Sequence, residues 1–368
     1  MTRPATAPSR PRWVWHGGGL SAARARFGGA ASTWIDLSTG INPHAWPGTD
    51  ACAPDWRRLP DDDALTALEA AAAAHFGADP SHVCALPGTE IGLRLLGALI
   101  SGPAYCRTPA YRTHAAMLGG AIALPDHALA TADGASLILA NPNNPDGRLW
   151  SREALLDLLE KRGPQGWLIL DEAFADALPG HSLAGHIADD RRLLLFRSFG
   201  KFFGLPGLRL GFLLGPRPLL DQVRVRLGAW PLPAAALTIG TAAYRDHGWI
   251  AAMPEHLRMQ AAALDAGLAR HGYRATGACP LFRLIETDDA DALFAHLARH
   301  RILTRPFDTA PRWLRLGLPA GPEESARLDA ALAAFAPNAT GHAAGAADSD
   351  AQAAPVPPLS AESRPVHG

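Results

Sequence analysis

Between about residues 83 and 235 the chain alternates short apolar runs with helical patterns, and this alternation restricts its fold more than any other feature. Three of the runs cover residues 135–140, 167–170 and 192–196, and a helical segment that begins near Ser151 separates the first two. None of the runs alternates apolar with polar residues, as a strand with one face in water would. The pattern predicts an α/β fold with a mostly parallel sheet that helices cover on both faces.

The chain has 368 residues, which is enough for two packed domains. We expect an irregular N-terminal arm at residues 1–45, a large domain at 46–235 and a smaller α+β domain at 236–336. Beyond Pro337 the composition shifts to Ala, Pro, Gly and Ser, which predicts a disordered tail at 337–368. Further elements are expected as helices at 63–76, 91–100, 219–230, 234–267 and 290–300 and as strands at 281–285 and 313–318.

Composition excludes several classes of protein. The formal net charge of −1 gives no reason to expect a nucleic-acid partner or an acidic membrane surface. No stretch approaches the roughly 20 apolar residues that span a bilayer, and residues 1–11 lack the apolar core of a signal peptide. The four cysteines form no C-x-x-C motif and no Cys/His cluster at metal-ligand spacing. We expect a cytoplasmic protein with reduced thiols, no metal site and no membrane partner.

Lysine is nearly absent, which makes the two lysines informative. Of the 34 lysines and arginines in the chain, only Lys161 and Lys201 are lysines. Arginine stays protonated, whereas a buried lysine can lose its proton and react as an amine nucleophile. Lys161 lies at the polar end of a predicted helix, where a solvated charge explains it. Lys201 lies in the apolar, Gly-rich segment Arg-Ser-Phe-Gly-Lys-Phe-Phe-Gly and is the candidate for amine chemistry.

Functional side chains follow the ends of the three predicted strands. The loop at 141–147 carries Asn144, Asp171 follows the second run, and Ser198 and Lys201 follow the third. Ligands of α/β sheets bind at the carboxyl ends of the strands, so these groups could converge on one ligand. Pyridoxal 5'-phosphate (PLP) needs such a set: an amine for a Schiff base, a carboxylate beside the pyridine nitrogen and a donor to the phenolate oxygen.

A phosphate site is also indicated. Pro87-Gly88-Thr89-Glu90 precedes a helical pattern, and a helix N-terminus binds anions. Ser198 and Arg209 could add a hydroxyl and a guanidinium. Each segment taken alone has a structural explanation, because a Gly-Thr-Glu start is usually a capping device and a single arginine usually forms a surface ion pair. The order and spacing of all of them together favour the cofactor.

These motifs resemble the class I/II PLP aminotransferase superfamily over about residues 14–335. The sequence Asn-Pro-Asn-Asn-Pro-Asp-Gly at 141–147 resembles its N-P-N-N-P-T-G loop, and Asp-Glu-Ala-Phe at 171–174 resembles its D-E-A-Y/F. Ser-Phe-Gly-Lys at 198–201 with Gly-Leu-Arg-Leu-Gly at 207–211 resembles its S-x-x-K…G-L-R-x-G signature. The resemblance implies fold type I of the PLP-dependent transferases, with a mostly parallel seven-stranded sheet in the large domain, and a homodimer.

The same resemblance implies the role of each residue. Lys201 is the Schiff-base lysine, Asp171 contacts the pyridinium and Asn144 contacts the phenolate. The aromatic ring of Tyr111 stacks on the cofactor, and Arg315 holds the carboxylate of the substrate. The cofactor phosphate is assigned to Gly88, Thr89, Ser198 and Arg209.

Two segments narrow the resemblance. His16-Gly-Gly and Asp-Leu-Ser-Thr-Gly-Ile-Asn-Pro at 36–43 are similar to the opening of the threonine-phosphate decarboxylases of the cobalamin pathway. Those enzymes convert L-threonine O-3-phosphate, a phosphorylated amino acid, to (R)-1-amino-2-propanol O-2-phosphate and CO₂. By that resemblance His16 and Asn42 line the substrate site, and Arg305 and Arg312 are further candidates for its anions.

Departures from the pattern leave alternatives open. Leu59 stands where the family has a tyrosine that reaches the neighbouring subunit's cofactor, and Phe174 stands where many aminotransferases have a tyrosine. An aminotransferase acting on histidinol phosphate would need 2-oxoglutarate and is the first alternative. A non-catalytic protein on this fold is the second, and the retention of Lys201 argues against it. Histidines other than His16 are expected at the surface or at helix ends, among them His75, His181 and His271.

Overall fold

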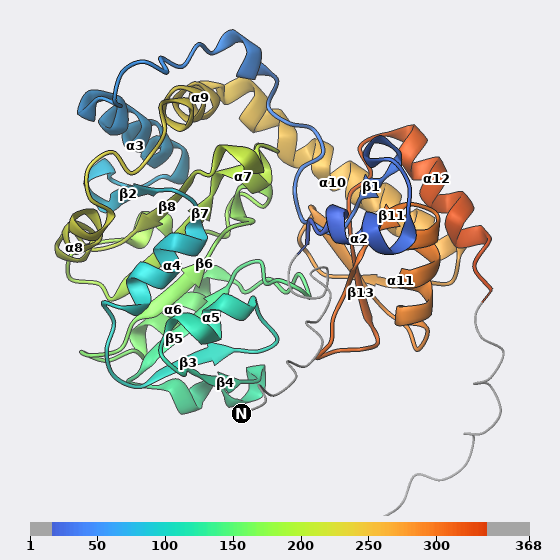
Figure 1. Ribbon diagram of the computed structural model, residues 1–368. Helices are drawn as coiled ribbons and strands as arrows, with labels where there is room; N and C mark the ends of the chain where they lie inside the picture. The colour runs from blue at the N-terminus through green and yellow to red at the C-terminus, as the bar shows by residue number, and fades with distance from the viewer. Residues whose placement is uncertain (1–16, 337–368) are drawn as a thin grey trace, which may run out of the picture. The chain divides into compact units, whose positions relative to one another are not determined.

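The computed structural model describes residues 17–336, so the predicted substrate residue His16 and the expected tail at 337–368 lie outside the described part. Its largest sheet has seven strands in the order β2-β8-β7-β6-β5-β3-β4 (Figure 1). Neighbouring strands are parallel except at β8, which is antiparallel to β2 and to β7. The predicted mostly parallel seven-stranded sheet is confirmed. The strands are β2 (Val83–Leu86), β3 (Ala104–Arg107), β4 (Ile122–Leu124), β5 (Ser136–Ala140), β6 (Leu168–Asp171), β7 (Leu193–Ser198) and β8 (Gly211–Leu214).

Both faces of this sheet are buried, which explains why its strands lack polar alternation. On β5, Leu137 and Leu139 belong to one apolar cluster and Ile138 belongs to another, because successive strand residues point to opposite faces. The cluster of Ile138 receives side chains from α4 (Thr89–Gly97), α5 (Arg112–Met117) and α8 (Arg217–Leu227). The other cluster receives them from α3 (Asp62–Phe76), α6 (Arg152–Glu160) and α9 (Ala234–Arg245).

Capping residues fix the helix ends that the sequence predicts well. α3 ends at Gly77, which has the left-handed φ of 69° that glycine adopts without steric cost. Ser151 caps α6, where its hydroxyl accepts a hydrogen bond from the backbone N–H of Ala154 at 3.2 Å. The observed helices therefore begin and end within a few residues of the expected positions.

The helix expected over 234–267 is in fact two helices, α9 and α10 (His247–Arg270). They separate at Asp246, whose carboxylate accepts hydrogen bonds from the N–H of Trp249 at 3.1 Å and from the indole of Trp46 at 3.0 Å. The side chain of Asp246 thus caps α10 and is held by a residue 200 positions away. That contact overrides an Ala-rich pattern that would otherwise continue through the junction.

A second, antiparallel sheet follows in the chain, in the order β12-β13-β10-β9. Its strands are β9 (Ala275–Thr276), β10 (Phe282–Glu286), β12 (Arg305–Pro306) and β13 (Trp313–Gly317), and α11 (Ala290–Arg299) and α12 (Pro322–Ala333) belong to the same part of the chain. The expected strands at 281–285 and 313–318 and the helix at 290–300 are confirmed. The division of the chain into domains at residue 235 stays a prediction.

Residues 17–45 are more regular than the expected arm. They contain α2 (Leu20–Phe27) and the short strand β1 (Ile35–Asp36), which pairs in parallel with β11 (Ile302–Leu303). The pairing continues at Leu37, whose N–H donates to the carbonyl of Leu303 at 2.8 Å. Trp34, Ile35 and Leu37 are buried, so this segment contributes to the core instead of lying outside it.

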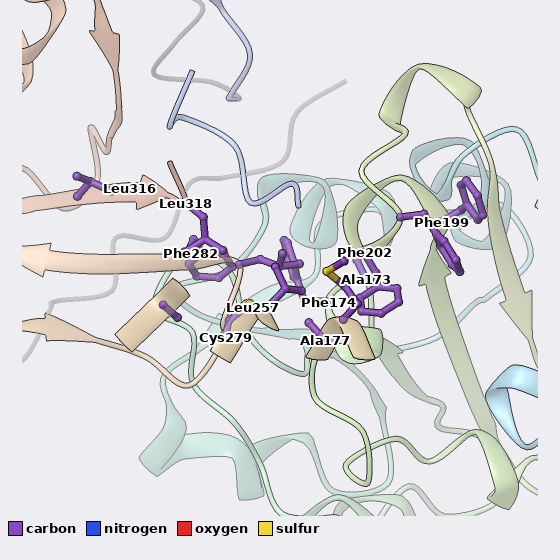
Figure 2. Packing of buried hydrophobic residues seen from close by; sticks show 14 of the residues in the cluster. Ala173, Phe174, Ala177, Phe199, Phe202, Leu257, Cys279, Phe282, Leu316 and Leu318 are labelled. Atoms are coloured by element: carbon purple, nitrogen blue, oxygen red, sulfur yellow. The ribbon is translucent and has the colours of Figure 1, made fainter. Parts of the chain in front are cut away.

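One apolar cluster extends from the large sheet to the smaller one. Figure 2 shows Phe174, just after β6, near Phe282 of β10, with Leu257 of α10 nearby. The rings of Phe174 and Phe282 meet edge to face with their centroids 5.2 Å apart. A Cβ atom on Gly40 would lie within 2.9 Å of both rings, so only glycine fits there. No helix in residues 17–336 has the length and apolarity that crossing a bilayer requires.

Candidate functional site

A cavity of about 260 Å³ lies where β5, β6 and β7 end. Most of the residues that the sequence analysis singled out line it, although they come from segments far apart in the chain. Convergence of this kind is expected at the carboxyl ends of parallel strands. The predicted residues in its wall are Gly88, Thr89, Tyr111, Asn144, Asp171, Ser198, Lys201, Arg209 and Arg315.

Lys201 lies on the short helix α7 (Phe199–Phe202), which starts directly after β7. Its amine is 5.9 Å from the centroid of the Phe174 ring and makes no hydrogen bond to any residue in the described range. Burial, with the nearby charge of Arg315, lowers the pKa of Lys201 to about 8, against a raising effect of Asp171. A larger share of this amine is therefore neutral and nucleophilic at physiological pH than for an ordinary lysine.

Asp171, the last residue of β6, is held at both carboxylate oxygens. Oδ1 accepts a hydrogen bond from the N–H of Ala173 at 3.1 Å, and Oδ2 lies 2.8 Å from Nε2 of His114. His114 is fully buried on α5, so the expectation that histidines other than His16 lie at the surface or at helix ends is wrong for it. Its spacing of three residues from Tyr111 could have indicated this, because such residues share one side of a helix.

Arg315 of β13 and Asn144 contact each other across the cavity wall. Nη1 of Arg315 donates to Oδ1 of Asn144, and Nη2 donates to the carbonyl of Ser38 at 2.8 Å. Nε of Arg315 is buried with no hydrogen-bond partner among residues 17–336. Burial, together with the adjacent Arg305, lowers the pKa of Arg315. An anionic ligand would supply the missing counter-charge.

The two further arginines suggested by the sequence have different positions. Arg305 of β12 is the strand neighbour of Arg315, and it also lines the cavity. Arg312 is largely exposed and pairs with Glu286 and Asp288 at 3.5 and 3.1 Å. Arg312 is therefore not in the wall of this cavity, whereas Arg305 lies in the wall beside Arg315.

The N-terminus of α4 forms another part of the wall. Gly88 is the N-cap residue, with φ 90°, and a Cβ atom there would lie 2.8 Å from Nη2 of Arg209. Thr89 and Ser198, which carry hydroxyl groups, also line the cavity. The backbone N–H groups at a helix start, a guanidinium and two hydroxyls are groups that suit a phosphate.

Asn42 is placed differently from its prediction. It does not line the cavity, and its side-chain N–H donates to the carbonyl of Phe202 at 2.8 Å. Its backbone N–H donates to the carbonyl of Lys201 at 2.9 Å. Because its side-chain and backbone N–H groups both donate to carbonyls of α7, Asn42 holds the backbone around Lys201.

The ends of β6 and β7 are tied together by buried charges that sequence analysis did not single out. Arg197, which precedes Ser198, pairs with Glu172 at 3.3 Å and with Asp176. His75 lies at the end of α3, and its Nε2 is 2.9 Å from Oδ1 of Asp176. Removing one partner of such a buried pair typically costs about 3–5 kcal/mol, so the cluster fixes the strand ends that carry the cavity residues.

The structure explains why Asp146 can replace the threonine of the family's N-P-N-N-P-T-G pattern. Its carboxylate accepts from the side chain of Asn143 at 2.7 Å and pairs with the buried Arg107 at 3.0 Å. A threonine would leave Arg107 with one carboxylate fewer, since Asp126 is the other. The charge at position 146 therefore stabilises the loop that carries Asn144.

The chemistry of the cavity fits PLP. The cofactor offers an aldehyde, a ring nitrogen and a phosphate, and the wall offers an amine without a hydrogen-bond partner among residues 17–336, a fixed carboxylate and a helix N-terminus with an arginine. Nothing in the wall requires a different group. The residues that would hold the cofactor are Lys201, Asp171, Asn144, Tyr111, Gly88, Thr89, Ser198 and Arg209.

Comparisons with known proteins agree with this assignment. Two relatives named threonine-phosphate decarboxylase, from Sinorhizobium sp. and Pseudomonas aeruginosa, are each 39% identical over 87% of this chain and 98% and 97% of their own lengths. A relative from Mycobacterium tuberculosis named histidinol-phosphate aminotransferase is 32% identical over 70% of this chain and 74% of its own length.

Solved structures give the same fold. A histidinol-phosphate aminotransferase from Sinorhizobium meliloti, in complex with PLP, has a TM-score of 0.76 at 20% identity, covering 90% of this chain and 97% of that one. L-threonine-O-3-phosphate decarboxylase from Porphyromonas gingivalis has a TM-score of 0.70 at 19% identity, covering 81% and 98%. Residues 125–335 match the family model described as aminotransferase class I and II. The chain belongs to the aminotransferase class I and II family, and PLP is its cofactor.

Proposed function

We propose that the chain decarboxylates L-threonine O-3-phosphate to (R)-1-amino-2-propanol O-2-phosphate and CO₂ in cobalamin biosynthesis. The relatives that carry the name threonine-phosphate decarboxylase match nearly their whole length at 39% identity, and those named for histidinol phosphate are more distant. The observation that carries the proposal is the pair of buried, neighbouring arginines in the cavity wall, Arg305 and Arg315. They suit a substrate that carries a carboxylate and a phosphate on the same molecule, as L-threonine O-3-phosphate does.

The residues of the cavity have separate roles in the proposed reaction. PLP, when bound, supplies an electron sink for the electrons of the broken Cα–carboxylate bond. Asp171, fixed by His114 and by the N–H of Ala173, holds a negative charge that stabilises the protonated ring nitrogen. Arg315 and Arg305 bind the substrate anions and so orient the bond that breaks. After CO₂ leaves, the Nζ of Lys201 donates a proton to Cα of the substrate.

The purified, PLP-loaded protein is expected to release one CO₂ for each L-threonine O-3-phosphate consumed, with no oxo-acid added. Measurement of CO₂ by a coupled carboxylase assay and of the amino alcohol by mass spectrometry checks this. L-Threonine without its phosphate serves as the control substrate and should react poorly. A PLP-loaded protein that releases no CO₂ but transaminates histidinol phosphate in the presence of 2-oxoglutarate would contradict the proposal.

A homodimer is part of the proposal. Trp56 and Leu59, which lies at the family's tyrosine position, are 74% and 65% exposed. Trp230 is also exposed and forms a shallow pocket with Pro60 and Asp61. Large apolar side chains gathered on a surface usually mark an interface. The expected partner is a second copy of the chain, because the family resemblance implies a homodimer. Sedimentation of a micromolar solution as a monomer would contradict this.

We also propose a cytoplasmic location. Cys52, Cys84, Cys106 and Cys279 are all free thiols, and burial raises the pKa of the thiols of Cys84, Cys106 and Cys279 to about 12. Thiols kept in this state are typical of a reducing compartment. Recovery of the protein in a periplasmic or secreted fraction would contradict this location.

A further inference from the structure

Glu90 lines the cavity, and the proposed function gives it no role. It is the second residue of α4, and both of its carboxylate oxygens are engaged. Oε1 accepts from Nε of Arg94 at 2.8 Å. Oε2 accepts from the hydroxyl of Tyr111 at 3.1 Å and from the hydroxyl of Thr113 at 2.9 Å.

These contacts are not those of a capping residue. Gly88 is the N-cap of α4, and no side chain caps this helix. The hydroxyl donors instead belong to the start of α5, which lies beside α4 (Figure 1). Glu90 therefore connects the helix whose N-terminus is the proposed phosphate site to the helix that carries His114, through the hydroxyls of Tyr111 and Thr113.

The protons of this group can be assigned. Burial raises the pKa of Glu90, but the hydrogen bonds from Arg94, Thr113 and Tyr111 lower it more, so the pKa lies below its ordinary value and the carboxylate is charged. Burial raises the pKa of Tyr111 to about 12. A hydrogen bond with Thr113 acts to lower this pKa, and the charge of Glu90 acts to raise it. Tyr111 is therefore a neutral phenol, and it gives its one hydroxyl proton to Glu90.

The Tyr111 ring is held at two places. Its hydroxyl is bonded to Glu90, and its ring meets the ring of His114 edge to face, with 5.6 Å between centroids. We propose that Glu90 is a positioning residue that fixes the Tyr111 ring against the cofactor. This inference rests on the proposed stacking role of Tyr111. If Glu90 positions Tyr111, the affinity for PLP depends on the Glu90 carboxylate even without a contact between Glu90 and the cofactor.

Four variants test the inference: Glu90→Ala, Glu90→Gln, Tyr111→Phe and the double variant Glu90→Ala/Tyr111→Phe. Glu255→Ala is the matched control, because Glu255 pairs with Arg258 on the exposed side of α10 as Glu90 pairs with Arg94. The Kd of the apoprotein for PLP is expected to rise about tenfold in Glu90→Ala and to stay unchanged in Glu255→Ala. In Glu90→Gln the amide oxygen still accepts both hydroxyls, so the rise is no more than about threefold.

The double variant separates positioning from a general loss of stability. Glu90→Ala and Tyr111→Phe remove the same hydrogen bond, so the double variant is expected to bind PLP no more weakly than the weaker single variant. Effects that add, or a Kd in Glu90→Ala equal to that of the unsubstituted chain, would overturn the inference.

A measurement without cofactor keeps the test independent of the proposed function. The chain has four tyrosines, and their ionisation is followed by ultraviolet absorbance of the apoprotein. Loss of the Glu90 charge should move one phenol to lower pH by roughly one unit or more, and an unchanged titration would overturn the contact itself. Normal PLP binding without CO₂ release would remove the proposed substrate and leave the role of Glu90 intact.

Discussion

Replacement of Lys201 by alanine is expected to lower kcat for CO₂ release from L-threonine O-3-phosphate by about 10⁴-fold or more. Among residues 17–336, Lys201 is the one amine in the wall of the cavity, since the other lysine, Lys161, lies at the end of α6. The Lys201→Ala variant lacks both the attachment point for the cofactor and the proposed proton donor. Lys201→Arg is expected to fail to the same extent, because a guanidinium keeps the charge but does not act as an amine nucleophile.

The pH dependence of cofactor attachment gives a second measurement on the same residue. Burial and Arg315 lower the pKa of Lys201 to about 8, and only the neutral amine attacks an aldehyde. The rate of covalent attachment of PLP to the apoprotein should therefore rise about tenfold per pH unit below pH 8 and level off above it. Stopped-flow absorbance measures this rate. A rise that continues to pH 10 would show an unshifted lysine, and activity above a tenth in Lys201→Arg would exclude Lys201 as the nucleophile.

The elements that were predicted correctly are those with local causes. The strands at 135–140, 167–170 and 192–196 were visible because both faces of the sheet are buried, which leaves continuous apolar runs. The number of strands in the sheet came only from the family resemblance, and the strand order was not predicted, because it depends on pairs such as Val83 with Leu214 that are far apart in the sequence. β1 has two residues and pairs with Ile302 and Leu303, so no periodicity could reveal it.

The residues of the site also differ in whether local sequence or distant contacts determine their roles. Lys201 and Asp171 were recognisable because each follows a strand, and strand ends converge for reasons of topology. His114 and Glu90 were missed because their roles come from single contacts, with Asp171 and with Tyr111, that join residues 57 and 21 positions apart. Asn42 was assigned to the substrate, but its side chain is used on the backbone of Phe202. A motif identifies a residue, and only the fold decides which way its polar groups face.

Arg315→Gln is expected to lower kcat/KM for L-threonine O-3-phosphate by about 10²- to 10³-fold, or about 3–4 kcal/mol, within the roughly 2–5 kcal/mol lost when one member of a buried charge pair is removed. Most of the loss should fall on KM, since the guanidinium binds the substrate. Arg315 is 2% exposed, and its Nη1 and Nη2 already donate to Asn144 and Ser38. Its Nε is buried without a partner among residues 17–336, so the guanidinium still has N–H donors for an anion.

Two further variants decide whether this loss is specific to substrate binding. Arg315→Lys keeps the charge but cannot bond Asn144, Ser38 and a substrate oxygen in the fork geometry of arginine, so it is expected to lose at least about tenfold in kcat/KM. Arg312→Gln, three residues earlier, removes an exposed arginine paired with Glu286 and Asp288 and should change kcat/KM by less than about twofold. Steady-state kinetics with a parallel PLP titration measures all three. If Arg315→Gln binds PLP normally and keeps its KM, the substrate anions bind elsewhere, and Arg315 acts only by holding Asn144.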